Sequence, residues 1–316
     1  MATTNQRVAV VTGASRGIGK GVAIELGRLG FTVYATGRSS RVSGITTERD
    51  MPVDEEVTVD ATAEAVTAAG GHGVGIRCDH SNDGEFDAII EEISSTVGRL
   101  DVLVYSAFQT PPNMDTAQFR APFWTQDGAM WDSVHGVGLR SAYLACCAAA
   151  PLMISTATQS SKSHASLPLI VLISSFGGRS FVFNVAYGVQ KAATDRLALD
   201  MHWQLQKHGV CTVSLYPGVV RTEGNLEMQR RGKWADASGG IDLTCGESPV
   251  YTGRAVAALC SLDAEQLCRR SGQVQVVAEL AKELGFRDAD GQQTPSIRSL
   301  KFILPNFVFP QIEAES

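Results

Sequence analysis

Two side chains with acid–base chemistry lie four residues apart in the segment Tyr187-Gly-Val-Gln-Lys191. On a helix, residues at i and i+4 lie on the same face. An ammonium close to a phenol favours the phenolate and lowers the tyrosine pKa from its ordinary value of about 10. A phenol tuned in this way can give a proton to a carbonyl oxygen, or take one from an alcohol. The spacing alone is also common on surface helices, so its position in the fold must decide between the two interpretations.

Two adjacent serines precede this pair, directly after the apolar run 169–173. Ser175 lies twelve positions before Tyr187, and Ser174 lies thirteen before it. Either hydroxyl can hydrogen-bond a substrate oxygen and stabilise charge that develops there. The other serine would then make local backbone bonds at the strand end.

A glycine-rich turn, Thr12-Gly-Ala-Ser-Arg-Gly-Ile-Gly19, follows the first apolar run. So tight a turn requires residues without Cβ, and the helix that follows directs its free N–H groups and positive dipole end at an anion. The alternative is a strand–helix turn with no ligand. The strand–turn–helix context favours the pyrophosphate of a dinucleotide.

The choice of dinucleotide depends on the end of the second predicted strand. NAD-binding folds place an acidic residue there to hold the ribose hydroxyls. This chain has Gly37-Arg38-Ser39 instead, and Arg16 of the glycine turn can approach the same point. Two guanidinium groups and a hydroxyl suit a 2′-phosphate, which predicts NADP(H). The alternative is that both arginines are ordinary surface residues.

These motifs require a sheet that brings several strand ends together. The sequence predicts strands at 8–12, 31–36, 75–78, 102–105, 169–173, 211–215 and 274–277, with helix-length segments between most of them. Such alternation predicts an α/β fold with a doubly wound, mostly parallel, Rossmann-like sheet in a single domain. Parallel strands present their carboxyl ends at one edge, so the glycine turn and the tyrosine helix are expected to meet there.

We assign residues 1–277 to one Rossmann-like cofactor-binding and catalytic domain. Within it, 41–57 is expected to be an exposed insertion and 222–249 a mobile substrate lid. Residues 278–316 are predicted to form a C-terminal extension packed on the domain. The apolar segment 300–310 is expected to cover the core or a partner subunit, with peripheral membrane contact as the alternative.

Composition argues against several other functions. The net charge of -6 and the lack of a basic run argue against nucleic acid as a partner. Seven cysteines without a C-x-x-C pair fit a reduced, cytoplasmic protein, and we predict no metal site. The longest apolar stretch, 142–154, is too short to span a bilayer, so no integral membrane segment is expected.

Together the motifs resemble the short-chain dehydrogenase/reductase family, whose glycine signature T-G-x-x-x-G-x-G matches Thr12 to Gly19. The resemblance covers about residues 7–272. The wider family's spacing would select Ser174, but alignment of the motif selects the second serine. The implied catalytic residues are therefore Ser175, Tyr187 and Lys191. The implied cofactor-binding residues are Gly13, Ser15, Arg16, Gly17, Ile18, Gly19, Arg38, Ser39, Asp79, Tyr187, Lys191, Pro217, Gly218, Val220 and Thr222.

The sequence departs from that family at two points. Tyr105-Ser106-Ala107-Phe108 stands where the family usually has N-N-A-G, and Gly138 replaces an Asn that supports a proton-relay water. Gly136 and Gly138 lie close together in a predicted helix, which makes a bend plausible. We hypothesise that a water held by a backbone carbonyl of this bend replaces the relay.

The resemblance implies an NADP(H)-dependent oxidoreductase of the carbonyl reductase type. Its substrate would be a carbonyl or secondary alcohol of a small apolar compound, and Phe108, Phe119, Phe123, Trp124 and Phe181 lie near loops that could face it. It also implies a homodimer or homotetramer. The alternative function is an NADP(H)-binding regulatory or scaffold protein with weak turnover, which the missing Asn motivates.

Overall fold

Seven parallel strands form one sheet in the order β3-β2-β1-β4-β5-β6-β7. The computed structural model describes residues 6–42, 54–112, 114, 116–160, 166–304 and 306. The strands are β1 (Val8–Thr12), β2 (Thr32–Gly37), β3 (His72–Arg77), β4 (Val102–Tyr105), β5 (Leu169–Ile173), β6 (Cys211–Tyr216) and β7 (Gln273–Val276). The predicted α/β fold with a doubly wound sheet is confirmed, and every strand pair in it is parallel.

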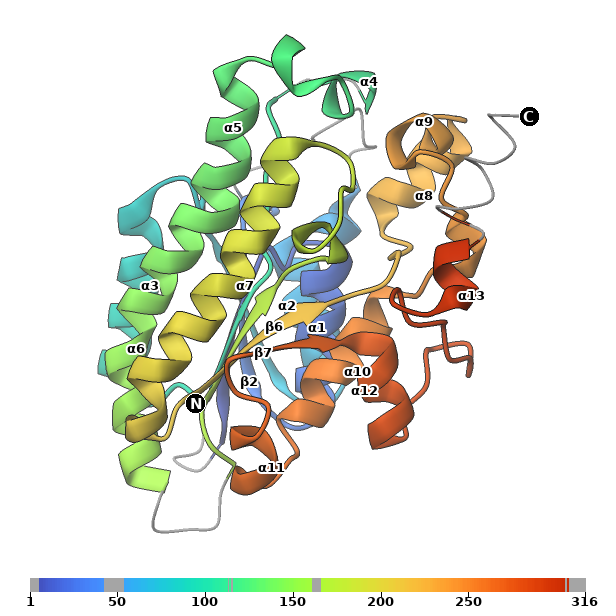
Figure 1. The fold of residues 1–316 in the computed structure, drawn as a ribbon. Coiled ribbons are helices and arrows are strands. Elements are labelled where there is room, and N and C mark those ends of the chain that lie inside the picture. Colours follow the sequence, from blue (N-terminus) through green and yellow to red (C-terminus); the bar gives the residue numbers. More distant parts are fainter. Residues whose placement is uncertain are drawn as a thin grey trace, which may run out of the picture.

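Helices cover both faces of the sheet (Figure 1). One face carries α1 (Gly17–Arg28), α2 (Val59–Ala68), α10 (Pro249–Leu259) and α12 (Val277–Leu284). The other carries α3 (Asp83–Thr96), α6 (Ser141–Ser160) and α7 (Val185–Leu205). Strands sandwiched in this way are apolar on both faces, which is why β1 and β5 read as continuous runs rather than alternating patterns.

Strand β3 begins three residues before the predicted 75–78 segment. A Cβ at Gly73 would lie 2.0 Å from the carbonyl oxygen of Ala63, and one at Gly75 would lie 2.7 Å from that of Val59. Helix α2 therefore rests directly on the backbone of β3. The glycines that permit this contact also remove the apolar side chains from which a strand is predicted.

Helix α5 (Gly128–His135) continues into α6 through a π turn, η3 (Gly136–Arg140). The run Gly128–Gln159 is long and apolar enough to cross a membrane by length and composition, which the sequence alone did not suggest. Half of its most apolar window is buried in the fold, against the core beneath β4 and β5. It is therefore weak evidence for a membrane span. Pro151 lies inside α6 and does not end it.

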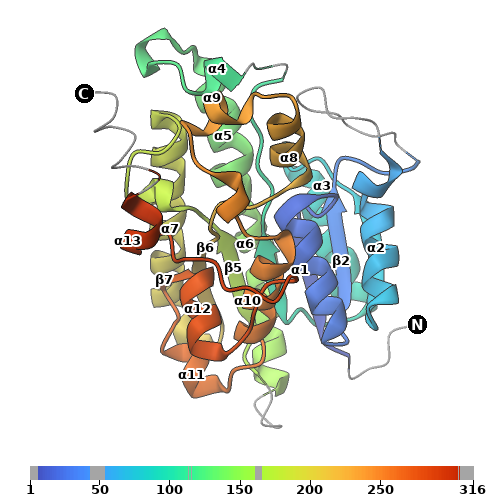
Figure 2. The ribbon, with the colours of Figure 1, turned by 90° about the vertical axis from the view of Figure 1, so that its right-hand side faces the viewer.

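The residues after β4 and β6 form a cap at one end of the sheet, where α4 (Thr116–Phe119) contacts α9 (Trp234–Ser238) (Figures 1 and 2). The stretch predicted as a lid contains α8 (Glu223–Arg230), α9 and η6 (Leu243–Cys245). Of the predicted insertion, residues 43–53 lie outside the described residues. The remaining short elements are η1 (Glu55–Val57), η2 (Phe123–Thr125), η4 (Phe176–Gly178), η5 (Gln206–His208), α11 (Ala264–Cys268) and α13 (Leu300–Ile303).

The described part of the C-terminal extension lies against the cap and the last strands. Ile297 and Phe302 pack with Tyr216 and Val276. The Oδ1 atom of Asn306 accepts a hydrogen bond of 3.2 Å from the backbone N–H of Asp242. Of the apolar segment 300–310, residues 305 and 307–310 lie outside the described residues, and the expectation for the segment as a whole stays a prediction.

Candidate active site

A pocket of about 660 Å³ lies at the carboxyl ends of the strands. It is lined by the residues that follow β1, β2, β3 and β4, by helix α7 and by α8 and α9 of the cap. Of the residues predicted to bind the cofactor, it contains Gly13, Ser15, Arg16, Gly17, Ile18, Gly19, Arg38, Ser39, Asp79, Tyr187, Lys191 and Thr222. The parallel sheet thus brings together segments that are far apart in the sequence.

The glycine turn has the geometry that its sequence predicts. Gly13 and Gly17 have φ angles of 64° and 56°, in the left-handed region that favours glycine. A Cβ at Gly19 would lie 2.4 Å from the carbonyl oxygen of Gly13, so no side chain fits there. The Thr12 hydroxyl accepts hydrogen bonds of 3.0 and 3.1 Å from the backbone N–H groups of Ser106 and Ala107. The turn is therefore fixed to the end of β4 although the N-N-A-G sequence is absent.

Arg16, Arg38 and Ser39 meet at one end of the pocket. The Nη2 atom of Arg16 donates a hydrogen bond of 3.1 Å to the Ser39 hydroxyl. Burial lowers the pKa of Arg38, Asp79 opposes that shift, and the nearby Arg16 and Arg77 add to it. Two guanidinium groups close enough to repel each other would be stabilised by a bound anion.

Asp79, which the resemblance also implies as a cofactor-binding residue, borders the same region. Burial raises its pKa, but hydrogen bonds from the backbone and hydroxyl of Ser81, together with Arg38 and Arg77, outweigh that effect and lower it. The side chain is therefore an ionised acceptor at neutral pH. It also turns the chain between β3 and α3, as an Asp commonly does.

The two candidate serines make different hydrogen bonds. A hydrogen bond from the Ser175 hydroxyl lowers the pKa of Tyr187 in opposition to burial. The Ser174 hydroxyl donates a hydrogen bond of 3.1 Å to the backbone oxygen of Lys191. Helix α7 begins just before the tyrosine because the Asn184 side chain accepts a hydrogen bond of 2.8 Å from the Tyr187 N–H. Ser175 is thus the serine whose hydroxyl faces the phenol.

Burial governs the ionisation of the tyrosine–lysine pair. It raises the pKa of Tyr187 to about 12 and lowers that of Lys191 to about 8, a shift that Asp195 opposes. The Lys191 Nζ atom donates a hydrogen bond of 3.1 Å to the backbone oxygen of Ile173, and it lies 5.6 Å from the centre of the Tyr187 ring. The lowering of the tyrosine pKa that we expected from the ammonium is therefore not seen. Desolvation of the phenol raises this pKa, and the hydrogen bond from Ser175 is what opposes the rise.

Three phenylalanines enclose the ring of Tyr187. The rings of Phe183, Phe108 and Phe119 lie 5.2, 5.9 and 6.3 Å from it, each near perpendicular to it. Phe108 and Phe119 were expected to face a substrate, and both line the pocket. The other three aromatic residues with that expectation do not line it and are more than half exposed, which corrects the prediction for Phe123, Trp124 and Phe181.

The other predicted cofactor residues line an adjoining cavity of about 200 Å³. Ser175 and Tyr187 border this cavity, and Ile297 and Phe302 of the C-terminal extension close it. Of the predicted residues, Pro217, Gly218 and Val220 line this cavity alone, whereas Ile18, Tyr187 and Thr222 line both. Tyr187 therefore lines both cavities, whereas Ser175 lines the smaller one.

A buried carboxyl supports this wall. A Cβ at Gly218 would lie 2.7 Å from the Oε2 atom of Glu247, so the carboxyl packs directly beneath the backbone. Burial, reinforced by the charge of Asp288, raises the pKa of Glu247 to about 8, although a hydrogen bond from Thr252 opposes the shift. Nothing in the sequence around Glu247 distinguishes it from an exposed loop acid.

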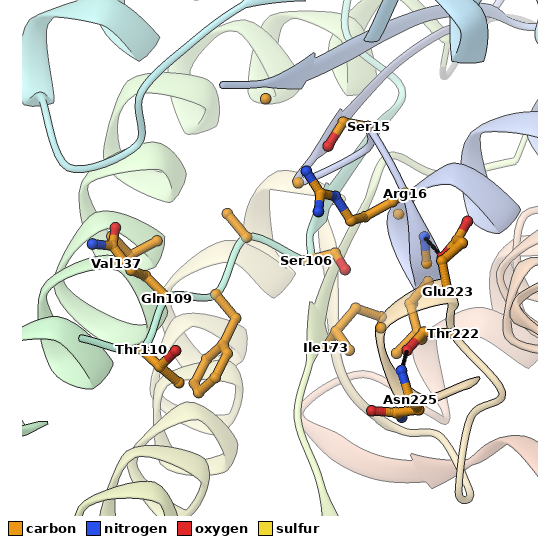
Figure 3. A pocket seen from close by; sticks show the side chains of 18 of the residues that line it. Ser15, Arg16, Ser106, Gln109, Thr110, Val137, Ile173, Thr222, Glu223 and Asn225 are labelled. Carbon is orange, nitrogen blue, oxygen red and sulfur yellow. Dashed lines mark hydrogen bonds between the residues drawn. The ribbon is translucent and has the colours of Figure 1, made fainter. Parts of the chain in front are cut away.

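Glu223 is a second acidic residue that the sequence analysis missed. Its Oε2 atom accepts a hydrogen bond of 2.8 Å from the backbone N–H of Gly17, in the first turn of α1 (Figure 3). Thr222 caps the helix that carries it, through the Asn225 N–H. Acids are common in the first turn of any helix, so the signal was present but not specific.

The π turn η3 is the irregularity expected at Gly136 and Gly138. Its carbonyl groups receive hydrogen bonds from protein side chains: Ser141 donates to Gly136 at 3.0 Å, and Tyr105 donates to Val137 at 2.8 Å. The Nε2 atom of Gln190 donates 2.7 Å to the Gly138 oxygen. Helix α7 thus provides one donor at this bend, and because a carbonyl oxygen can accept two hydrogen bonds, the water of the hypothesis stays a prediction.

Comparison with known proteins agrees with this geometry. Residues 7–232 match the family described as short chain dehydrogenase, and the chain belongs to that family. It is therefore an oxidoreductase of a family that uses nicotinamide dinucleotides. Among its relatives is the mouse protein dehydrogenase/reductase SDR family member 1, 36% identical over 303 residues, which span 94% of this chain and 88% of the relative.

Solved structures show the same fold. A metagenomic short-chain oxidoreductase in complex with NADP is 27% identical, with a TM-score of 0.62 over 87% of this chain and 98% of that one. The 3-oxoacyl-[acyl-carrier protein] reductase from Brucella melitensis, in complex with NAD, is 21% identical, with a TM-score of 0.67 over 86% of this chain and 96% of that one. The second likeness concerns the fold alone.

Proposed function

We propose that this protein is an NADP(H)-dependent oxidoreductase of the carbonyl reductase type. It would interconvert a carbonyl and a secondary alcohol on a small apolar substrate. The observation that carries the proposal is the shared pocket. Tyr187 and Lys191 line the same pocket as Arg16 and Arg38, and Ser175 bonds the phenol.

The residues present fit an NADP(H) molecule. The glycine turn is too tightly packed for side chains, since a Cβ at Gly17 or Gly19 would meet neighbouring protein atoms at 3.2 or 2.4 Å. Such a turn before a helix suits a pyrophosphate at the start of α1. Arg16, Arg38 and Ser39 are donors suited to a 2′-phosphate. When bound, the nicotinamide supplies or accepts the hydride.

The chain's own residues handle the proton and the substrate oxygen. With a pKa of about 12 the phenol of Tyr187 is protonated at neutral pH, so it serves as the acid in carbonyl reduction. The Ser175 hydroxyl orients the substrate oxygen and stabilises negative charge on it. Lys191, charged below about pH 8, stabilises the phenolate left after proton transfer and contributes to cofactor binding.

The enclosure of Tyr187 supports an apolar substrate. Phe108, Phe119 and Phe183 surround the phenol, and the adjoining cavity has further apolar walls in Trp234, Ile241, Ile297 and Phe302. A substrate carbonyl placed between Ser175 and Tyr187 would find polar partners in those two hydroxyls. Such a site binds by apolar contact and orients by a few polar groups.

A second function remains open on one observation. Gly138 lacks the Asn side chain of the family's usual relay, which would suit an NADP(H)-binding regulatory or scaffold protein with weak turnover. The hydrogen-bonded Ser175 and Tyr187 favour the enzyme.

The two functions separate in one assay. Purified protein is incubated with NADPH and a panel of apolar aldehydes and ketones, and NADPH oxidation is followed for the wild type and Tyr187→Phe. Turnover that depends on Tyr187 supports the enzyme. Tight NADPH binding with no Tyr187-dependent turnover on any compound supports the scaffold.

We also propose that the protein is a cytoplasmic homodimer or homotetramer that associates through α6 and α7. These helices present exposed apolar side chains at Tyr143, Val189, Leu199 and Trp203. Light scattering after gel filtration should give a multiple of the 33.7 kDa chain mass, and Trp203→Glu should reduce it. A wild-type protein that elutes as a monomer would contradict this proposal.

A further inference from the structure

Gln190 joins the catalytic helix to the π turn. Its side chain is fully buried. Its Nε2 atom donates hydrogen bonds of 2.7 Å to the backbone oxygen of Gly138 and of 2.9 Å to the Thr194 hydroxyl. A Cβ at Gly138 would lie 3.1 Å from both Cδ and Nε2 of Gln190. The carboxamide of Gln190 therefore occupies the space beside position 138 that a side chain there would enter.

The place of Gln190 in α7 links this contact to the chemistry. It directly precedes Lys191 and lies three residues after Tyr187. Helix α7 contacts both α5 and the π turn. A bond from Gln190 to the Gly138 backbone therefore fixes the face of α7 next to the one that carries the catalytic pair.

A glutamine at this buried position carries a cost. Among the described residues its Oε1 atom has no hydrogen-bond partner. A buried acceptor without a partner is unfavourable, and an apolar side chain of similar length would avoid the penalty. The hydrogen bonds made by the amide nitrogen are thus the feature that distinguishes glutamine from methionine at this site.

We propose that Gln190 is a positioning residue, which supplies from α7 the carboxamide that position 138 lacks and holds the π turn against the catalytic helix. The inference rests on the proposed function only in its consequence for proton transfer. The hydrogen bond from Gln190 connects α7 to the π turn. Without it, that connection would depend on a side chain at position 138.

Loss of this bond should change the surroundings of Lys191. The ammonium is buried beside Tyr187 and Phe108, and on its own helix it faces Asp195. The charge on Asp195 is in turn held by Arg179, at 3.9 Å, and by the hydroxyls of Tyr216 and Ser214. A looser contact between α7 and the π turn would admit water to Lys191 and relieve its desolvation.

The test measures the titration of Lys191 directly. NMR of protein with ¹³C-labelled lysine follows the seven lysines of the chain, and Lys191→Arg assigns the signal. Gln190→Met keeps the length of the side chain and removes the hydrogen bonds, and Gln190→Asn is a milder variant that cannot reach Gly138. Gln275→Met is the matched control, because Gln275, on the edge strand β7, is also buried and its side chain accepts a hydrogen bond from Arg270.

We expect the Lys191 pKa to rise by at least about half a unit in Gln190→Met, and not in Gln275→Met. The high-pH limb of kcat/KM should move with it, which a merely structural role would not cause. The double variant Gly138→Asn/Gln190→Ser returns a carboxamide from the other helix and should restore the titration. Gly138→Asn alone crowds the side chain of Gln190 and should not give the wild-type titration of Lys191.

A Lys191 titration that is unchanged in both Gln190→Met and Gln190→Asn would overturn the proposal. So would a double variant no closer to the wild type than Gln190→Met. The NMR titration requires neither cofactor nor substrate. Failure of the wild type to oxidise NADPH would therefore refute the proposed function and leave the role of Gln190 to be decided by the titration.

Discussion

The carboxylate of Glu223 accepts a hydrogen bond of 2.8 Å from the backbone N–H of Gly17. The contact joins the start of α8 to the first turn of α1, where the free N–H groups of a helix attract anions. A cofactor pyrophosphate bound at this turn would lie close to the negative charge of Glu223.

Neutralising this carboxylate should therefore strengthen cofactor binding. We expect Glu223→Gln to lower the Kd for NADPH by about three- to tenfold, the scale of a single charge at a helix end. Fluorescence titration measures the constant. Glu227→Gln is the control, because Glu227 also lines the pocket but pairs with Arg230 and Arg231. An unchanged or higher Kd in Glu223→Gln would show that the carboxylate does not oppose the cofactor.

Arg38 should determine the choice of dinucleotide. In Arg38→Asp a carboxylate faces the 2′-phosphate, and the preference should shift from NADPH toward NADH by at least about tenfold. The ratio of the two Kd values, measured under the same salt conditions, reports the effect. Equal affinity of the wild-type protein for NADPH and NADH would contradict the proposed specificity.

The pH dependence of carbonyl reduction should follow Lys191. Burial lowers its pKa to about 8, so the ammonium is present below that pH and is lost as the pH rises through it. Because kcat/KM reports groups of the free enzyme, it should decline above about pH 8. A steady-state profile over the neutral and alkaline range checks this. A profile that stays flat well above pH 9, about one unit higher, would exclude Lys191 as the controlling group.

Glu247 should make stability depend on pH in the opposite way to an ion-paired acid. Its pKa is raised to about 8 in the folded protein, so between its ordinary value of 4.5 and about 8 the folded state holds a proton that the unfolded state has lost. Stability therefore falls as pH rises through this window. Glu247→Gln has no such proton, and its Tm relative to the wild type should rise with pH. A constant difference in Tm across that range would argue against a protonated Glu247.

Local patterns were sufficient to locate the glycine turn and the Tyr187–Lys191 pair, because the residues of each motif are close in sequence. The strands that are continuous apolar runs, such as β1 and β5, could also be predicted from local composition. The contact of Gln190 with Gly138 spans 52 positions, and that of Glu223 with Gly17 spans 206. Only the assembled sheet brings such residues together, so no spacing rule predicts them.

The burial of the tyrosine could not be inferred from the sequence and follows only from the structure. The sequence gives no measure of how deeply Tyr187 is enclosed by three aromatic rings. Charge proximity alone predicted a lowered tyrosine pKa, whereas desolvation in the assembled pocket raises it. Likewise, Phe123, Trp124 and Phe181 share the aromatic character of the pocket walls but lie on its outside.

Transfer of deuterium from NADPH labelled at C4 of the nicotinamide tests the central claim most directly. Mass spectrometry of the alcohol formed from an apolar ketone or aldehyde follows the label. We predict one deuterium on the new carbinol carbon with the wild-type protein, and formation at least about a hundredfold slower with Tyr187→Phe, which removes the acid but keeps the ring. NADPH binding should largely survive that substitution. Deuterium transfer at the wild-type rate in Tyr187→Phe would contradict the account, and so would tight NADPH binding by the wild type without labelled product.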